Sequence, residues 1–317
     1  EAISRFLDKT IHVKYDPKSE IVATVGATEA INVAIFALFN PEDKILVPTP
    51  VFSLYWPVAN LAGVQYSLVN TASDDFKLTA EKLEEVVKND STIKGVILNY
   101  PTNPTGVEYS HEEIKQLAKI VEKYNLYVIT DEIYSSLTYG VEHYSIATEI
   151  PERTLYISGL SKSHAMTGYR LGYITRKKKV MDQISKVHSL MVTTTTDSSQ
   201  AAAIEALTNG INDSEEYKKI YQKRRDFVVN ELSKMDVELV NPQGAFYIFA
   251  KIPEKYGTDD MQFALDLAFK KKVGVTPGSA FGPGGEGYIR LSYASSDEAL
   301  QVALKRIGEF LKEGNEE

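Results

Sequence analysis

The sequence predicts an α/β protein with a mostly parallel sheet covered by helices, followed by a smaller C-terminal α+β domain. Short apolar runs rich in Val, Ile and Tyr alternate with longer segments of helical period over the first half of the chain. These runs are nearly continuous in apolar character, which is typical of strands buried on both faces. After Thr175 the pattern changes to long polar helices with fewer strands, which indicates a second, smaller domain.

Seven strands are expected before this change, because each is a short apolar run bounded by turn residues. They are Glu20–Thr24, Lys44–Pro48, Val64–Val69, Gly95–Asn99, Tyr127–Thr130, Thr154–Ser158 and Leu171–Thr175. The helices expected between them include Thr28–Leu38, Thr79–Lys88 and His111–Tyr124. The third helix carries apolar residues at helical spacing, namely Ile114, Leu117, Ala118 and Val121. Thr79 and Ser110 are the expected N-caps, since a carboxylate closely follows each.

The C-terminal part is expected to combine helices with a few strands. The expected helices are Lys177–Met191, Glu215–Met235, Asp260–Lys271 and one that starts at Asp297. The expected strands are Glu238–Val240, Ala245–Ile252, Val273–Thr276 and Gly287–Ser292. We expect residues 1–176 to form the large domain, although its first few residues could join the small one. Residues 177–210 would complete the large domain with an interdomain helix, and residues 211–317 would form the small domain.

The bulk composition excludes several classes of protein and site. The chain has 317 residues and no cysteine, which excludes disulfides, thiolate metal sites and a cysteine nucleophile. Its net charge of −8 argues against nucleic acid as a partner. No apolar run approaches the ~20 residues that cross a bilayer, so no membrane association is expected. A cytoplasmic location is the default expectation, but the chain starts at Glu1 rather than Met, so a preceding segment could be missing.

The turn at Gly26, Ala27 and Thr28 is suited to a phosphate group. A strand ends there, small residues make a tight turn and a helix begins, which leaves backbone amides and the Thr28 hydroxyl free for an anion. A plain strand-to-helix turn capped by Thr28 explains the segment equally well when it is taken alone. The sequence contains neither a GxGxxG fingerprint nor a Walker loop, so dinucleotide and P-loop sites lose their main support.

Two further motifs follow apolar strands, at the edge where open α/β sheets bind ligands. Asn103 lies in the segment Tyr100–Gly106, whose two prolines and glycine impose a defined turn, and its amide can donate to a ligand oxygen. Asp131 ends another apolar run and can keep a pyridine nitrogen protonated, which makes the ring an electron sink. A structural asparagine turn and a helix N-cap are the alternative roles of these two residues.

The segment Gly159–Gly172 carries the most specific pattern. Lys162 is preceded by small residues and followed eight positions later by Arg170. A lysine amine can form a Schiff base with an aldehyde and later shuttle protons. A guanidinium can clamp a phosphate dianion. A salt bridge on the surface is the alternative, but it does not explain the whole pattern.

Taken together, these motifs resemble those of fold-type I pyridoxal 5′-phosphate (PLP)-dependent aminotransferases of class I/II, in the same order and over essentially the whole chain. The lysine segment is similar to that of bacterial aromatic and N-acetyl-diaminopimelate aminotransferases. The resemblance implies PLP as cofactor, a homodimer, and transamination of an L-amino acid that is aromatic, broad-range or N-acetyl-diaminopimelate-like. The acceptor would be a 2-oxo acid such as 2-oxoglutarate.

The resemblance also implies which residues hold the cofactor. Lys162 would carry PLP and transfer the proton at the substrate Cα, and Asp131 would pair with the pyridinium nitrogen. Asn103 and Tyr134 would hydrogen-bond the phenolic oxygen. The residues implied for the phosphate are Ala27, Thr28, Arg170, and either Ser158 or Ser161.

Three further roles follow from the same resemblance. Arg290, in an alternating strand, would grip the substrate α-carboxylate with two hydrogen bonds. Phe52 would stack on the cofactor ring, and Phe246 would line the pocket for the substrate side chain. A purely structural place in the core is the alternative for both phenylalanines.

The chain departs from the family's pattern in two places. Relatives usually have a segment before the position of Glu1, with a glycine-bearing loop over the substrate and a tyrosine that reaches the partner's phosphate. Gly159 takes the place of a serine that binds phosphate in many relatives. β-Elimination on the same scaffold and a PLP-sensing regulatory domain are alternative functions. Strict aspartate specificity is disfavoured, because Thr193–Ser199 offers no arginine.

Overall fold

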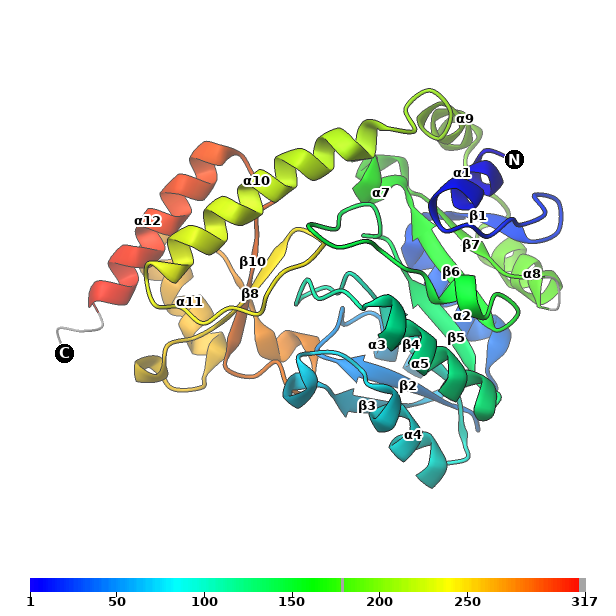
Figure 1. Ribbon diagram of the computed structural model, residues 1–317, viewed down its shortest axis with the longest axis horizontal. Helices are drawn as coiled ribbons and strands as arrows, with labels where there is room; N and C mark the ends of the chain where they lie inside the picture. The colour runs from blue at the N-terminus through cyan, green and yellow to red at the C-terminus, as the bar shows by residue number, and fades with distance from the viewer. Residues whose placement is uncertain (178–179, 314–317) are drawn as a thin grey trace.

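The computed structural model describes residues 1–177 and 180–313, whose strands form two sheets. A seven-stranded sheet takes its strands from the first 175 residues, and a three-stranded sheet takes its strands from the C-terminal part. Figure 1 shows the larger sheet among helices on one side of the molecule and the smaller sheet with its own helices on the other. The expected fold class, a mostly parallel sheet covered by helices with a smaller α+β part, is therefore confirmed.

The large sheet has six strands in one direction and one strand against them. The strands are β1 (Ile21–Val25), β2 (Lys44–Thr49), β3 (Gln65–Asn70), β4 (Ile93–Asn99), β5 (Tyr127–Asp131), β6 (Thr154–Gly159) and β7 (Leu171–Thr175). Their order is β1-β7-β6-β5-β4-β2-β3, and only β7 runs antiparallel to its neighbours. The carboxyl ends of the other six strands therefore meet at one edge, where ligands bind in such sheets. All seven strands lie where the sequence predicts them.

Helices cover both faces of this sheet because its strand residues are apolar on both sides. Ile97 and Ile129 pack with α2 and α8, whereas their neighbours Val96, Leu98 and Val128 pack with α4 and α5. The α-helices are α1 (Ala2–Thr10), α2 (Gly26–Leu38), α3 (Tyr55–Leu61), α4 (Ala80–Asn89), α5 (His111–Lys123), α6 (Ile146–Glu149), α7 (Leu160–Ser163), α8 (Met181–Val192), α9 (Asp197–Ala206), α10 (Asp213–Ser233), α11 (Asp260–Lys271) and α12 (Asp297–Glu313).

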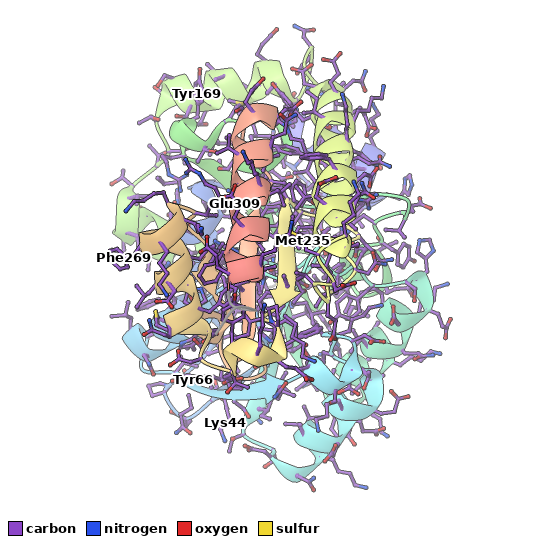
Figure 2. All side chains as sticks on the ribbon, turned by 90° about the vertical axis from the view of Figure 1, so that its left-hand side faces the viewer. Lys44, Tyr66, Tyr169, Met235, Phe269 and Glu309 are labelled. Carbon is purple, nitrogen blue, oxygen red and sulfur yellow. The ribbon has the colours of Figure 1, made fainter. Side chains whose placement is uncertain are left out.

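The small sheet is antiparallel, in the order β8 (Tyr247–Lys251), β10 (Tyr288–Ser292) and β9 (Thr276–Pro277). Its apolar residues form one core with α10, α11 and α12. Helix α10 runs from the neighbourhood of α7 in the large part to α12 in the small part (Figure 1). Figure 2 shows α12 between α10 and α11, with Glu309 on α12 and Phe269 on α11. The two parts are thus joined by one long helix.

Two predicted helix starts are confirmed by their caps. The Ser110 hydroxyl accepts from the backbone N–H of Glu113, and the Glu113 carboxylate accepts from the N–H of Ser110. This reciprocal pair is a capping box, which satisfies two amides at the start of α5. The Thr79 hydroxyl accepts from the N–H of Lys82 at the start of α4. Local sequence therefore determines where both helices begin.

Other predicted bounds differ from the structure. The expected strand Glu238–Val240 is reduced to one bridge, between Leu239 and Ala250, because Pro242 soon ends the extended run. Of Val273–Thr276, only Thr276 joins a strand, since Lys272 turns with φ +58° after α11. Helix α8 begins later than expected, at Met181, and the expected residues Lys178 and Lys179 lie outside the described part of the chain.

Five helices of the described part, α1, α3, α6, α7 and α9, were not predicted. Helix α1 buries Phe6 and Leu7 in a cluster with Tyr156 of β6 and Tyr173 of β7, so it packs on the large sheet. The division into domains at residues 176 and 210 stays a prediction. In residues 1–177 and 180–313, no helix has both the length and the apolar character that crossing a membrane requires.

Candidate active site

A cavity of about 280 Å³ lies at the carboxyl-terminal edge of the large sheet and reaches the small sheet. Its lining comes from the ends of β4 and β5, the starts of α2 and α7, and strands β8 and β10. Ten of the twelve predicted site residues line this cavity. They are Ala27, Thr28, Phe52, Asn103, Asp131, Tyr134, Ser161, Lys162, Arg170 and Arg290. Residues far apart in the sequence are thus brought together in one place.

The start of α2 presents a site for an anion. Val25, its N-cap, provides no side-chain cap, and the amides of Ala27 and Thr28 lie at the cavity. Gly26 has φ +75°, and a Cβ there would lie 2.5 Å from Nη2 of Arg170. Glycine alone leaves room for the guanidinium beside the helix start. Helix amides and a guanidinium both favour an anion, so a phosphate fits this corner of the cavity.

Asp131 is the last residue of β5, and its side chain is buried. The hydroxyl of Tyr55 donates to Asp131 Oδ2 over 2.9 Å, and the N–H of Ile133 donates to Oδ1 over 3.3 Å. Burial raises the pKa of Asp131 to about 6, while these two donors act to lower it. A cation beside this carboxylate would favour its charged form, so the position suits a protonated ring nitrogen.

Lys162 lies in the short helix α7, directly after β6. Its Nζ lies 5.9 Å from the ring centre of Tyr134 and 5.4 Å from that of Phe246. Burial lowers the pKa of this amine, and the charges of Arg170 and Arg290 lower it further, against the opposing effect of Asp131. A lowered pKa increases the fraction of neutral amine, which is the form that attacks an aldehyde or accepts a proton.

Arg290 enters the cavity from β10 in the small sheet. Its Nη1 donates to Asn103 Oδ1 over 2.7 Å, and its Nη2 donates to Thr276 Oγ1 over 3.2 Å. Its guanidinium carbon lies 4.4 Å from the ring centre of Tyr247 and 4.9 Å from that of Phe281. The Nε atom is buried without a partner among the described residues. The guanidinium is therefore held in place and still has N–H groups for a ligand carboxylate.

The orientation of Asn103 follows from its contact with Arg290. A guanidinium has no acceptor, so the asparagine presents its carbonyl oxygen to Arg290 and its NH₂ group elsewhere. The N–H of Asn103 itself donates to Asn99 Oδ1 over 3.0 Å, which holds the turn in place. The amide group is thus positioned as a donor beside the cavity, as the predicted contact with a phenolic oxygen requires.

Two predicted site residues do not line the cavity. The Ser158 hydroxyl donates to the carbonyl oxygen of Glu132 over 3.2 Å, so its hydrogen is not available to a phosphate. Ser161 does line the cavity, which favours it as the serine that compensates for Gly159. Phe246 lies behind the lining, with its ring against those of Tyr134 and Tyr247 at 5.3 Å and 4.8 Å.

Several lining residues were missed by sequence reasoning. They are Ile31, Tyr55, Asn99, Ile133, Thr167 and Tyr247. Tyr55 follows Phe52 by three residues at the start of α3, a helix whose turn the sequence pattern did not reveal. Tyr247 directly follows Phe246 in the strand predicted over Ala245–Ile252, in which neighbouring side chains would point to opposite faces. That expected alternation is the one available signal that only one of the two aromatic residues faces the site, although the structure places Phe246 in the turn before β8.

Comparisons with known proteins show which family this chain resembles. The sequence profile of the family described as aminotransferase class I and II matches residues 1–307. A probable N-acetyl-LL-diaminopimelate aminotransferase of Bacillus subtilis is 41% identical over 311 residues, which cover 98% of this chain and 78% of the relative. An aspartate aminotransferase of Thermotoga maritima is 40% identical, over 92% of this chain and 75% of the relative. The crystal structure of an aromatic aminotransferase from Pyrococcus horikoshii superposes with a TM-score of 0.94 at 36% identity, covering 98% of this chain and 84% of that one.

Proposed function

We propose that this chain, which belongs to the class I and II aminotransferases, acts on an L-amino acid that is aromatic, broad-range or N-acetyl-diaminopimelate-like, with 2-oxoglutarate as acceptor. The chain is a PLP-dependent enzyme that catalyses transamination, as its family and relatives show. The observation that carries the substrate proposal is the distribution of charge in the cavity. Among the described lining residues the only guanidinium groups are Arg170 and Arg290, while Phe52, Tyr55, Tyr134 and Tyr247 supply aromatic surface.

Arg170 and Arg290 have separate tasks in this proposal. Arg170 lies beside the start of α2 and serves the cofactor phosphate with Ala27, Thr28 and Ser161. Arg290 lies at the small sheet and grips the substrate α-carboxylate with its planar fork. No third guanidinium lines the described cavity for a side-chain carboxylate, so this lining favours aromatic donors over aspartate. The N-acetyl-diaminopimelate-like part of the proposal rests instead on the similarity to the Bacillus subtilis relative.

Bound PLP supplies a pyridinium ring that stabilises the electron pair left at Cα when the C–H bond breaks. Asp131 would supply the negative charge for the ring nitrogen, and Tyr55 holds its carboxylate in place. Asn103 and Tyr134 would donate to the phenolic oxygen. Phe52 lies at the cavity as the aromatic residue for the ring face, and Phe246 supports Tyr134 from behind.

Lys162 is the acid–base residue of the proposal. Its Nζ would hold the cofactor, and once released by the substrate amine it would be the base available to take the proton from Cα. Burial and the charges of the two guanidinium groups lower the pKa of this amine, so a neutral amine is available at a lower pH than for an exposed lysine. No other lysine lines the described cavity.

A homodimer is part of the same proposal. Large apolar side chains are exposed on the segments that follow the cavity residue Arg170 and lead into α9, namely Leu190, Met191, Val192 and Ile204. Leu190 is 88% exposed, and its neighbours Met191 and Val192 are exposed too, so three consecutive apolar residues at the end of α8 face outward. Sedimentation of the PLP-loaded protein tests this directly, with a dimer expected and an active monomer contrary to it.

The substrate proposal is tested with a panel of amino donors and 2-oxoglutarate. The panel contains phenylalanine, tyrosine, N-acetyl-diaminopimelate, leucine and aspartate. We expect kcat/KM for at least one of the first three to exceed that for aspartate by roughly tenfold or more. Aspartate as the best donor would contradict the proposal. Release of pyruvate from cysteine-type donors without any 2-oxo acid would instead support the β-elimination alternative.

A further inference from the structure

Tyr134 and Tyr247 form a buried pair of phenols at the cavity. Their hydroxyl oxygens lie 2.9 Å apart, and their rings meet edge to face with centres 5.8 Å apart. Tyr134 follows β5 of the large sheet, whereas Tyr247 begins β8 of the small sheet. Both line the cavity, and both are at least nine-tenths buried. The pair therefore connects the two parts of the molecule at the site itself.

Hydrogen counting shows what this pair can offer a ligand. Two phenols carry two hydrogens, and one of them lies between the two oxygens. Within residues 1–177 and 180–313, neither hydroxyl has another hydrogen-bond partner. One O–H thus remains to donate into the cavity. If Tyr134 uses its hydrogen for an anionic oxygen, Tyr247 must donate to the Tyr134 oxygen.

Tyr247 also contacts the group that binds the substrate carboxylate. The guanidinium carbon of Arg290 lies 4.4 Å from the centre of the Tyr247 ring, so the cation rests on its aromatic face. The positive charge of Arg290 acts to lower the pKa of both tyrosines, although burial raises both overall. A charge change at Arg290, such as the arrival of a carboxylate, therefore acts on both tyrosines, and Tyr247 contacts both Arg290 and Tyr134.

Building on the proposed function, we propose that Tyr247 is a positioning residue that orients the Tyr134 hydroxyl as a donor to the cofactor's phenolic oxygen and links it to Arg290. The Tyr247 hydroxyl acts on Tyr134, because an O–H that accepts a hydrogen bond becomes a better donor. The Tyr247 ring acts on Arg290 by supporting its guanidinium. The two actions reside in different atoms of one side chain, so they can be separated.

Tyr247→Phe and Tyr247→Leu separate these actions. Tyr247→Phe keeps the ring beneath Arg290 and removes the hydroxyl. We expect the pH midpoint of the visible absorbance change of the PLP-loaded protein, measured without substrate, to rise by about half a unit to one unit. Without the Tyr247 hydroxyl, Tyr134 donates a weaker hydrogen bond, so more negative charge stays on the phenolic oxygen of the cofactor. That charge holds the nearby proton more tightly, and the midpoint therefore moves to higher pH. KM for amino acids should change by less than roughly threefold, since the ring remains.

Tyr247→Leu should give the same midpoint shift and also raise KM by roughly tenfold, because the aromatic face is lost. Phe281→Leu is the matched control, since Phe281 offers Arg290 its other ring, at 4.9 Å, and has no hydroxyl. It should raise KM without moving the midpoint. Melting temperatures of all three variants identify any loss of folding.

The outcomes distinguish this proposal from the proposed function. A wild-type protein without the visible absorbance of bound PLP would overturn both. If folded Tyr247→Phe has the same pH midpoint as the wild type, only the proposed role of Tyr247 is overturned. An equal midpoint shift in Phe281→Leu would also overturn it, because the shift would then not depend on the hydroxyl.

Discussion

The Tyr55 hydroxyl donates to Asp131 Oδ2 over 2.9 Å, and both side chains are buried at the edge of the large sheet. Asp131 ends β5 and Tyr55 begins α3, so the contact joins segments 76 residues apart. The hydrogen bond stabilises the charged carboxylate, which burial alone would disfavour. The charge that faces the ring nitrogen therefore depends on a tyrosine outside the predicted set of site residues.

We expect Tyr55→Phe to weaken PLP binding and to reduce kcat by roughly tenfold, the usual effect of removing a hydrogen bond to a charged group. Loss of the donor also raises the pKa of Asp131, so the acid limb of the kcat/KM profile should move to higher pH. Tyr66→Phe is the control, because Tyr66, labelled in Figure 2, lies on β3 and does not line the cavity. An unchanged acid limb in Tyr55→Phe would contradict the assigned contact.

Asp131 itself should destabilise the cofactor-free chain as the pH rises. Its folded pKa of about 6 lies above the ordinary value of 3.8, so the folded state holds the proton more tightly than the unfolded state. Stability is therefore lost as the pH rises from about 4 to about 6, by an amount on the order of 3 kcal/mol, and the loss is complete above that range.

Asp131→Asn should remove this dependence, which urea unfolding at pH 4.5 and pH 7 can measure on the cofactor-free chain. We expect the variant to be more stable than the wild type by about 1 kcal/mol at the lower pH and by about 3 kcal/mol at the higher pH. In the PLP-loaded protein it should cost several orders of magnitude in kcat, while Asp131→Glu should cost less. Wild-type turnover in Asp131→Asn would refute the role of the carboxylate.

A substitution at Gly172 tests whether a phosphate binds at the start of α2. A Cβ at this position would lie 2.5 Å from the backbone N of Ala27, so the turn at the start of α2 would have to move. Gly172→Ala should weaken PLP binding by roughly tenfold or more, since overpacking of this kind typically costs 1–3 kcal/mol. Gly274→Ala is the matched control, because an added Cβ there meets nothing within 4 Å. Equal PLP affinity in both variants would argue against a phosphate at this turn.

Arg290→Lys distinguishes amino-acid chemistry from cofactor binding alone. A lysine keeps the charge but loses the fork that matches two carboxylate oxygens. We expect the cofactor spectrum to be preserved and kcat/KM for every α-amino acid to fall by roughly 10- to 100-fold. Reaction with simple amines, which have no carboxylate, should hardly change. Equal losses for both substrate classes, together with a lower melting temperature, would indicate a structural salt bridge instead.

Sequence patterns over a few neighbouring residues predicted the elements that short-range interactions determine. The seven strands of the large sheet and the caps at Thr79 and Ser110 follow from apolar runs and short-range hydrogen bonds. The short helix α3 does not, because its burial depends on distant strands rather than on its own periodicity. The same limit explains why Asp131 was predicted and its donor Tyr55 was not.

Residues in recognisable motifs were placed correctly in the cavity, whereas residues selected only by tertiary packing were not. Lys162 and Arg170 share one motif and line the same cavity. Phe246 lies in the turn just before β8, and Tyr247 is the first residue of β8; only Tyr247 lines the site. The path of this turn decides which of the two rings faces the cavity, and the sequence alone does not determine that path.

Identification of the lysine that carries PLP tests the central claim most directly. The PLP-loaded protein is reduced with borohydride, digested and mapped by mass spectrometry, with Lys162→Ala as the control. Lys162 is the only lysine that lines the described cavity, and its pKa is lowered by burial and by two guanidinium groups. We expect the label on the peptide that contains Lys162 and on no other peptide, and no fixed label in the variant. A label on a different lysine, or undiminished labelling of Lys162→Ala, would contradict the account.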